Sequence, residues 1–298
     1  MMDRTRLEAE PPAHEVAAVV VNYNAGKALT ECVASLKREG VSVIVVVDNG
    51  STDGSLEYLA ATNPDVQVLH TGRNLGFGGG VNYGARRTSG ELLLVCNPDL
   101  ELQSGALRAM VDRLTNDPSL GLVGPALVTP AGDLQPSGRA FPTLRRSSVQ
   151  AVLGVIFPEN GYSRRYREAN CARAGIGIVD WVTGACLLVR RGAFEAVGGF
   201  DGRYFMYVEE VDLCWRLAGA GWRTGYEESA RVLHLAGVST AAVPYRMIVA
   251  HHLSLWRFAR RTTRGSERLL LPGVAMGILG RSVVVCLRRA VVQSEWRR

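Results

Sequence analysis

Acidic side chains follow two of the apolar segments in this sequence. "SVIVVVDNG" (42–50) leads into Asp48, and "LLLVCNPDLEL" (92–102) places Asn97 and Asp99 after its apolar run. Both aspartates could simply form turns. In a parallel α/β sheet, however, ligands bind at the carboxyl ends of the strands. Asn97 and Asp99 would point the same way on an extended segment, and such oxygen ligands suit Mg²⁺ or Mn²⁺.

The familiar phosphate-binding loops are missing from the sequence. The first apolar segment is not followed by Gly-x-Gly-x-x-Gly, and no Gly-x-x-x-x-Gly-Lys-Ser/Thr occurs. A phosphorylated ligand would therefore need a bound cation. The absent glycine fingerprint also disfavours a dinucleotide-dependent oxidoreductase.

A second cluster of acids lies in "YVEEVDLCWR". On a helix, Glu209 and Asp212 share one face while Glu210 points elsewhere. A solvated acidic first turn is one interpretation. The preceding residues 205–207 (Phe-Met-Tyr) are apolar or aromatic, and such surroundings raise a carboxylate pKa toward that of a general base. His234 is either a structural histidine or a further ligand for the cation at Asp99.

The elements that must position these residues alternate between strand and helix. Continuous apolar runs separated by helices predict an α/β fold with a mostly parallel, Rossmann-like central sheet flanked by helices. The Gly-rich segment 72–87 leads into a helix; it is either a surface loop or backbone that lies close to a ligand, with Arg73 and Asn74 available for phosphate or sugar. The strands are expected at 16–24, 42–50, 66–70 and 91–97, and the first two helices at 26–38 and from about 51 to 61.

Charge is unevenly distributed over the 298 residues. Residues 241–298 contain eleven arginines, no lysine and two acids, so they carry +9, and the remaining chain carries −3. The six cysteines show no zinc or disulfide spacing and predict core positions in a reducing compartment. Residues 1–15, with charges and two prolines, predict a disordered N-terminus and no secretory signal.

Seven blocks in order resemble the inverting family 2 glycosyltransferases of GT-A fold, and among these the bacterial rhamnosyltransferases. The resemblance covers 16–240 and implies a GT-A domain followed by a C-terminal helical extension, 241–298. The blocks are "VVVNYN", "VVDNGSTDGS", "GRNLGFGGGVNYGAR", "LLLVCNPD", "WVTGACLLVRR", "GGFDGRYFMYVEEVDLCWRLAGAGW" and "VLHLAG".

The resemblance also implies roles for individual residues. Glu210 falls on the catalytic base, with Glu209 as the substitute because Glu210 replaces the commoner aspartate. The other roles are donor binding by Tyr23, Asp48 (nucleobase), Arg73, Asn74, Gly76, Asn97 and Asp99; metal binding by Asp99, Asn97 and His234; and acceptor binding by Trp181, Gly184 and Asp212. Asn97 replaces the first aspartate of the Asp-x-Asp metal motif, which removes one charge from the site.

The function implied is metal-dependent inverting transfer of L-rhamnose from dTDP-β-L-rhamnose to N-acetylglucosaminyl-diphospho-polyprenol. The linkage would be α-1,3, in assembly of a cell-wall linker, with Mg²⁺ or Mn²⁺ as cofactor. One alternative is the same fold with UDP-galactofuranose or a UDP- or GDP-hexose as donor. Another is a non-catalytic scaffold that binds nucleotide sugars.

The basic tail predicts contact with a membrane. Residues 245–268 form a helical pattern in which six arginines fall within an arc of about 100°. The apolar run 269–289 contains Pro272 and Arg281 and is expected to be a poor membrane span. Either the tail is a helical pair that covers the catalytic domain, or it is an interfacial region attracted to anionic lipid. We prefer the second and expect a cytoplasmic enzyme, peripheral on the inner face of the cell membrane.

Two further questions concern partners. Nucleic-acid binding is disfavoured because no stacking or groove-reading motif accompanies the arginines. The sequence leaves the oligomeric state open, and a homodimer is compatible with it.

Overall fold

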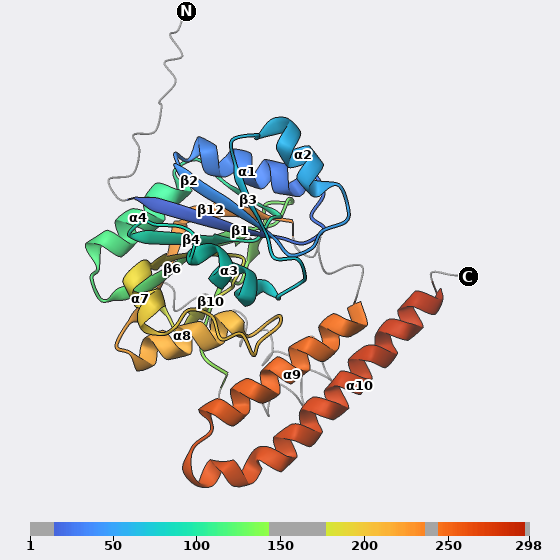
Figure 1. The fold of residues 1–298 in the computed structure, drawn as a ribbon. Coiled ribbons are helices and arrows are strands. Elements are labelled where there is room, and N and C mark those ends of the chain that lie inside the picture. The colour runs from blue at the N-terminus through green and yellow to red at the C-terminus, as the bar shows by residue number, and fades with distance from the viewer. Residues whose placement is uncertain (1–14, 143–176, 236–243, 296–298) are drawn as a thin grey trace, which may run out of the picture.

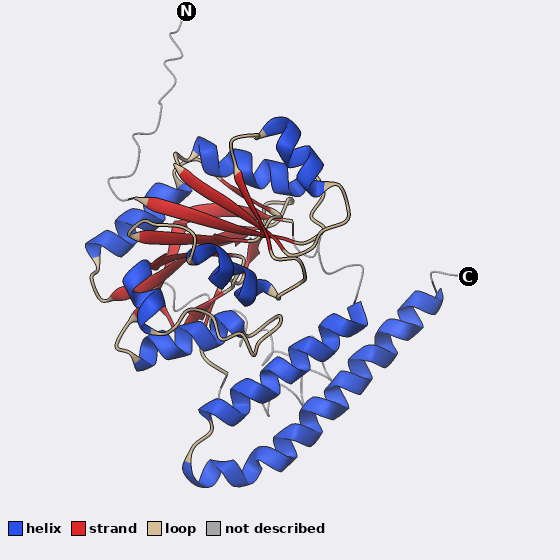
Figure 2. Cartoon of the chain, viewed as in Figure 1, coloured by secondary structure: helices blue, strands red, loops and turns tan. Residues whose placement is uncertain are grey.

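The computed structural model describes residues 15–142, 177–235 and 244–295. The N-terminal region expected to be disordered falls on residues 1–14, outside the described residues, as does the expected domain boundary near residue 240. A sheet with helices on both faces forms the larger part of the molecule, and two long helices lie beside it (Figures 1 and 2).

The first half of the chain forms the parallel half of the sheet. Four strands run parallel in the order β3-β2-β1-β4. Every residue of β1 and β4 is buried, which explains their continuous apolar runs. The elements are β1 (Val16–Asn22), α1 (Ala28–Arg38), β2 (Val43–Asp48), α2 (Ser55–Thr62), β3 (Gln67–His70), α3 (Phe77–Ala85) and β4 (Leu92–Cys96).

The second half of the chain completes the sheet with mixed pairing. The order continues β4-β11-β6-β12-β5; β11 is antiparallel to both of its neighbours, and β12 is parallel to β6 and antiparallel to β5. The elements are β5 (Leu100–Leu102), α4 (Ala106–Asn116), β6 (Leu120–Val128), β11 (Cys186–Arg190), α7 (Arg191–Ala196), α8 (Glu209–Gly219) and β12 (Arg223–His234). Two short edge strands, β7 (Leu134–Gln135) and β9 (Ile178–Val179), join this sheet, and β8 (Gly138–Arg139) pairs with β10 (Trp181–Val182).

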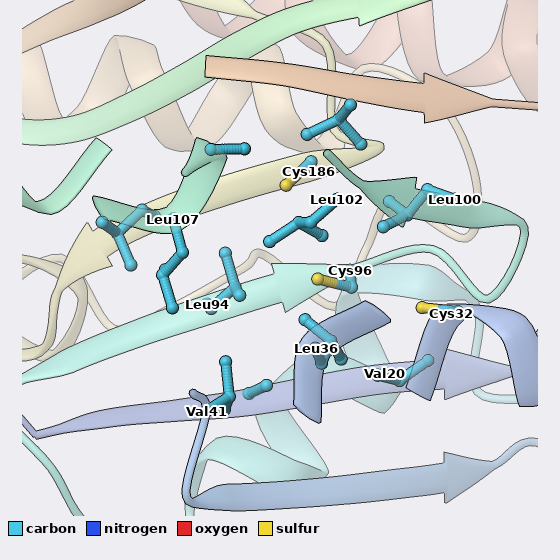
Figure 3. Packing of buried hydrophobic residues seen from close by; sticks show 14 of the residues in the cluster. Val20, Cys32, Leu36, Val41, Leu94, Cys96, Leu100, Leu102, Leu107 and Cys186 are labelled. Carbon is cyan, nitrogen blue, oxygen red and sulfur yellow. The ribbon is translucent and has the colours of Figure 1, made fainter. Parts of the chain in front are cut away.

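Apolar side chains fill both faces of the sheet. One cluster packs α1 and α4 against one face, and a second packs α3, α7 and α8 against the other. Three thiols lie in the first cluster, on α1, β4 and β11 (Figure 3). The buried free cysteines of the described residues are Cys32, Cys96, Cys186 and Cys214, as expected for core positions.

The Gly-rich segment forms helix α3 and contacts the sheet. A Cβ on Gly84 would lie 2.6 Å from Val19 Cγ1 and 2.8 Å from Val47 Cγ2, and one on Gly80 would lie 2.7 Å from Val21 Cγ1. Gly80 and Gly84 therefore admit neighbouring strands. The start of the segment, with Asn74 and Phe77, lines a cavity, and its closeness to a ligand stays a prediction.

The C-terminal region forms two long helices that pack side by side (Figure 1). They are α9 (Pro244–Thr262) and α10 (Leu271–Glu295), joined through the 3₁₀ helix Gly265–Leu270. Helix α9 ends at Thr262, so Arg264 and Arg268 lie beyond the helix on which we expected them.

Helix α10 is also more continuous than expected. Pro272 lies in its first turn, where a proline is tolerated, and therefore does not interrupt it. Among the described residues, the 26-residue segment Gly265–Ala290 is long and apolar enough to cross a membrane by length and composition, and none of its most apolar window is buried. The expectation of a poor span was therefore wrong on those two criteria.

Candidate active site

A cavity of about 340 Å³ opens at the carboxyl ends of the parallel strands. It brings together eight of the residues singled out from the sequence: Tyr23, Asn74, Asn97, Asp99, Gly184, Glu209, Glu210 and His234. Five others do not line it: Asp48, Arg73, Gly76, Trp181 and Asp212. The strands that end here are β1, β2, β4 and β12, which explains how residues so distant in sequence meet.

Asp48 is held in the turn that follows β2. Its carboxylate accepts hydrogen bonds from Asn22 Nδ2 (3.3 Å), the Gly50 N–H (3.3 Å) and the Ser51 N–H (3.2 Å), and it lies 3.6 Å from His70 Nδ1. These contacts give Asp48 a turn-forming role. A role in reading the nucleobase stays a prediction.

Asn49 is a wall residue that the sequence interpretation missed. Its Nδ2 donates to the Gly76 carbonyl (3.0 Å), which links the end of β2 to the start of α3. The signal was its place in Asp-Asn-Gly directly after a buried strand. Gly76 has φ +77°, and a Cβ there would overlap the Phe205 carbonyl oxygen. Gly76 therefore permits close contact between the start of α3 and the segment before α8.

The metal-binding expectation rests on Asp99 and His234. Strand pairing places His234 opposite Leu100, and His234 Nε2 lies 3.6 Å from Asp99 Oδ1. Asp99 is 4% exposed, and its Oδ1 is buried with no hydrogen-bond partner in the structure. A buried carboxylate oxygen without a partner is costly unless a ligand satisfies it.

The imidazole of His234 is oriented by a residue that the sequence did not indicate. Gln135 Oε1 lies 3.2 Å from His234 Nδ1, and Gln135 Nε2 donates to the His234 carbonyl (3.3 Å). With the proton on Nδ1, Nε2 faces Asp99 as a free ligand, the arrangement usual for metal-binding histidines. The described residues contain no group of three or more His, Cys, Asp or Glu side chains placed to hold a metal. Asp99, His234 and Asn97 could supply part of a cation site, and its other ligands would then be a phosphorylated substrate and water.

Glu209 and Glu210 begin helix α8 and line the same cavity. Glu209 is 4% exposed, and its Oε2 has no partner; burial, together with the neighbouring Glu210, raises its pKa well above the usual value. Burial also raises the pKa of Glu210, to about 7, although Glu210 stays partly open to the cavity and Arg139 pulls its pKa down. One carboxyl is thus suited to stay protonated and the other to exchange a proton near neutral pH.

Two features of the backbone place Glu210. Gly184 leaves room for it, because a Cβ at Gly184 would lie 3.2 Å from Glu210 Cβ. Tyr207 and Val208 adopt left-handed conformations, with φ +65° and +69°, directly before α8. Such conformations are rare for these side chains, and for a β-branched residue they cost energy.

Asp212 and Trp181 have other contacts than those expected. Asp212 is fully buried; its Oδ2 accepts a 2.6 Å hydrogen bond from Arg216 Nε, and its Oδ1 lies 3.2 Å from Arg261 Nη1. Its two oxygens thus face arginines, and Asp212 does not line the cavity. Trp181 Nε1 donates to the Ala140 carbonyl (3.0 Å), and its ring lies under Arg139. Neither residue lines the cavity, and their assignment to the acceptor side stays a prediction that this geometry does not favour.

Comparison with known proteins gives a consistent result. Residues 17–198 match the model of the family described as glycosyl transferase family 2. An N-acetylglucosaminyl-diphospho-decaprenol L-rhamnosyltransferase of Mycobacterium tuberculosis is 37% identical over 297 residues, covering 94% of this chain and 95% of that protein. The rhamnosyltransferase WbbL of Escherichia coli is 33% identical over 132 residues, covering 44% of this chain and 47% of that protein.

Solved structures show the same fold at lower identity. A mannosyltransferase of Pyrobaculum calidifontis in complex with GDP-Man and Mn²⁺ aligns with a TM-score of 0.57 at 16% identity, covering 93% of this chain and 75% of its own. GalNAc-T7 with UDP, GalNAc and Mn²⁺ aligns with a TM-score of 0.55 at 16% identity, covering 74% of this chain and 43% of its own. At these identities the likeness concerns the fold alone.

Proposed function

Because this chain belongs to glycosyltransferase family 2, we propose that it transfers a rhamnosyl group from a nucleotide sugar to a lipid-linked sugar acceptor. The chain is a glycosyltransferase of GT-A fold. The single structural observation that supports transfer from a nucleotide sugar is the convergence in one cavity of the Asp99–His234 pair and Glu210. The Asp99–His234 pair suits a cation bound to a diphosphate, and Glu210 suits the role of a general base.

The cation would be Mg²⁺ or Mn²⁺, held by Asp99 and His234 with Asn97 beside them. When bound, it would neutralise charge on the diphosphate of the donor. The orphaned Oδ1 of Asp99 and the Gln135–His234 contact support this placement. The Mn²⁺ in the two structural neighbours is a property of those proteins.

The reaction proposed is a single in-line displacement. Glu210 accepts the proton of the acceptor hydroxyl, whose oxygen forms a bond to the anomeric carbon. The bond from that carbon to the diphosphate oxygen breaks, and its electron pair leaves with the nucleoside diphosphate. One displacement inverts the anomeric centre, so a β-L-rhamnosyl donor would give an α-linked product. Burial favours the protonated form of Glu209, so Glu210 is the member of the pair that ionises near neutral pH.

The proposed donor is dTDP-β-L-rhamnose and the proposed acceptor N-acetylglucosaminyl-diphospho-polyprenol, with an α-1,3 linkage. The M. tuberculosis relative, whose name specifies that acceptor type and L-rhamnosyl transfer, supports both because the match spans nearly the whole of both chains. The alternative donor classes, UDP-galactofuranose and UDP- or GDP-hexoses, share the same reaction.

Calorimetric titration tests the donor. The protein is titrated with dTDP-rhamnose, UDP-galactofuranose, UDP-glucose and GDP-mannose, each with Mn²⁺ and again with EDTA. We expect Mn²⁺-dependent binding of dTDP-rhamnose alone. Binding of a UDP or GDP sugar in its place would refute the rhamnosyl assignment while leaving the reaction class intact.

We also propose that α10 lies on an anionic membrane surface on the cytoplasmic side, where a polyprenyl acceptor is presented. Its exposed apolar residues are Met276, Leu279, Val283 and Leu287, and three arginines follow or interrupt them, Arg281, Arg288 and Arg289. Apolar area and positive charge together favour anionic interfaces. The full chain should float with vesicles that contain phosphatidylglycerol and not with phosphatidylcholine alone, and Leu279→Asp should weaken flotation. Resistance to alkaline extraction would instead indicate a spanning helix.

A further inference from the structure

Helix α9 contacts the segment that forms one wall of the active site. Ser254 Oγ donates to the Met206 carbonyl (3.1 Å), and the His251 ring lies 5.3 Å from the Tyr207 ring, centroid to centroid. Met206 and Tyr207 both line the catalytic cavity. Helix α9, which follows the sheet domain in sequence, thus packs against two residues of the cavity wall.

Phe258 extends this contact into an apolar cluster. It is 3% exposed and packs in one cluster with Tyr204, Val208 and Val211. Val208 precedes the two glutamates, and Val211 follows them. The first turn of α8 is therefore packed directly against α9.

Arg261 adds two ion pairs to the same surface. Its Nη1 lies 2.7 Å from Asp201 Oδ2 and 3.2 Å from Asp212 Oδ1, and its guanidinium lies 5.7 Å from the Trp215 ring centroid. Asp212 is on α8, two residues after Glu210, and Asp201 is at the other end of the 201–208 segment. One nitrogen of α9 thus joins both ends of the segment that leads into the catalytic helix.

This segment needs such support because of its backbone. Tyr207 and Val208 hold left-handed conformations immediately before Glu209. Conformations of this kind cost about 1–3 kcal/mol each and persist only where the surroundings enforce them. The contacts of Ser254, His251 and Phe258 fall on Met206, Tyr207 and Val208 themselves.

We propose that α9 is part of the active-site architecture and that Arg261 is a positioning residue that fixes the start of α8, and through it the carboxylate of Glu210. The proposal rests on the proposed function, in which Glu210 is the base. Arg261 acts on the acceptor-activating side of the cavity. The donor side is built by strand ends that carry Tyr23, Asn49, Asp99 and His234.

Hydrogen exchange of the full-length protein tests the structural half of the proposal without any substrate. In Arg261→Met we expect amide exchange in residues 206–214 to rise at least tenfold, while β1 and β4 change less than twofold. Arg261→Lys should restore protection, because both ion pairs use one nitrogen. Arg257→Gln, an exposed arginine one turn earlier on α9, should match the wild type.

Kinetics test the functional half. A displacement of about 1 Å can cost up to a hundredfold in rate, so we expect Arg261→Met to lower kcat ten- to a hundredfold with donor Kd within twofold of wild type. Arg261→Lys should recover kcat to within threefold. Should Arg261→Met fail to fold, Ser254→Ala is expected to give the same local pattern of exchange, at about threefold, with a lowered kcat.

Three results would overturn the proposal. These are wild-type exchange and kcat in Arg261→Met, a rise in exchange that extends equally through β1 and β4, and no recovery in a folded Arg261→Lys protein. A wild-type protein that transferred no sugar would refute the proposed function alone. The exchange comparison would still decide whether α9 holds the start of α8.

Discussion

The pH dependence of transfer should follow the ionisation of Glu210. Burial raises its pKa to about 7, and a general base must be ionised to accept the hydroxyl proton. A group with that pKa is about one-tenth ionised at pH 6 and about nine-tenths ionised at pH 8. We therefore expect kcat/KM to rise about tenfold between pH 6 and pH 8, with its midpoint near pH 7.

Substitutions distinguish the roles of the Glu209 and Glu210 carboxyls. Glu210→Gln should lower kcat by about 10²–10⁴-fold, the usual contribution of a general base. Glu209→Gln resembles the protonated form that burial favours at Glu209. It is the matched control and should show the same rise in kcat/KM with pH as the wild type. Arg139 lowers the Glu210 pKa, so Arg139→Gln should move the midpoint of the kcat/KM profile to higher pH. An active Glu210→Gln protein, or a rate that stays flat from pH 6 to pH 8, would refute the assignment.

The same shift has a consequence for stability. A carboxyl whose pKa is raised in the folded state, here from 4.5 to about 7, favours folding while it is protonated. Its contribution declines as the pH rises through that interval. Each pKa unit corresponds to about 1.4 kcal/mol, and partial exposure to the cavity reduces the effect. At pH 8 the free energy of unfolding of Glu210→Gln, measured by urea denaturation, should therefore be about 1–2 kcal/mol higher than that of the wild type.

Three further predictions concern the metal site and the core. Asp99→Ala should abolish Mn²⁺-dependent donor binding in calorimetry while leaving the far-UV circular dichroism unchanged. Gln135→Ala frees the His234 imidazole and should weaken Mn²⁺ affinity about 10–100-fold, and unchanged affinity would contradict the orienting role. Gly84→Ala adds a methyl group against two strand valines and should destabilise the protein by about 1–3 kcal/mol. Gly277→Ala, where a Cβ meets no atom within 4 Å, should leave Tm unchanged or raise it.

The parallel half of the fold could be predicted from the sequence because β1, β2 and β4 are buried almost throughout and read as continuous apolar runs. The antiparallel strands could not. Their partners are distant in sequence: β5 pairs with β12 through Leu100 and His234. That pairing brings His234 to Asp99, and nothing local in the sequence encodes it. The resemblance to a family supplied His234 as a site residue.

The differences between expectation and structure at the site have a common cause, which is that side-chain partners far away in sequence decide what an acid does. Asp212 shares a helical pattern with Glu209, and only the structure shows that Arg261 occupies it. Gln135 lay in a stretch without a motif, yet it contacts the ring of His234. Likewise, the glycines of α3 gave no sign of whether a ligand or a strand lay against them.

The distribution of the thiols makes the C-terminal helix open to selective labelling. The four buried cysteines are shielded from reagents, and burial raises the pKa of the Cys214 thiol to about 12. Cys286 is the partly exposed thiol of the described residues, and it lies on α10 between Val283 and Leu287. Cys171 lies outside the described residues and would be replaced by serine. A polarity-sensitive maleimide dye would then attach at Cys286, and its emission would report directly whether this helix enters lipid.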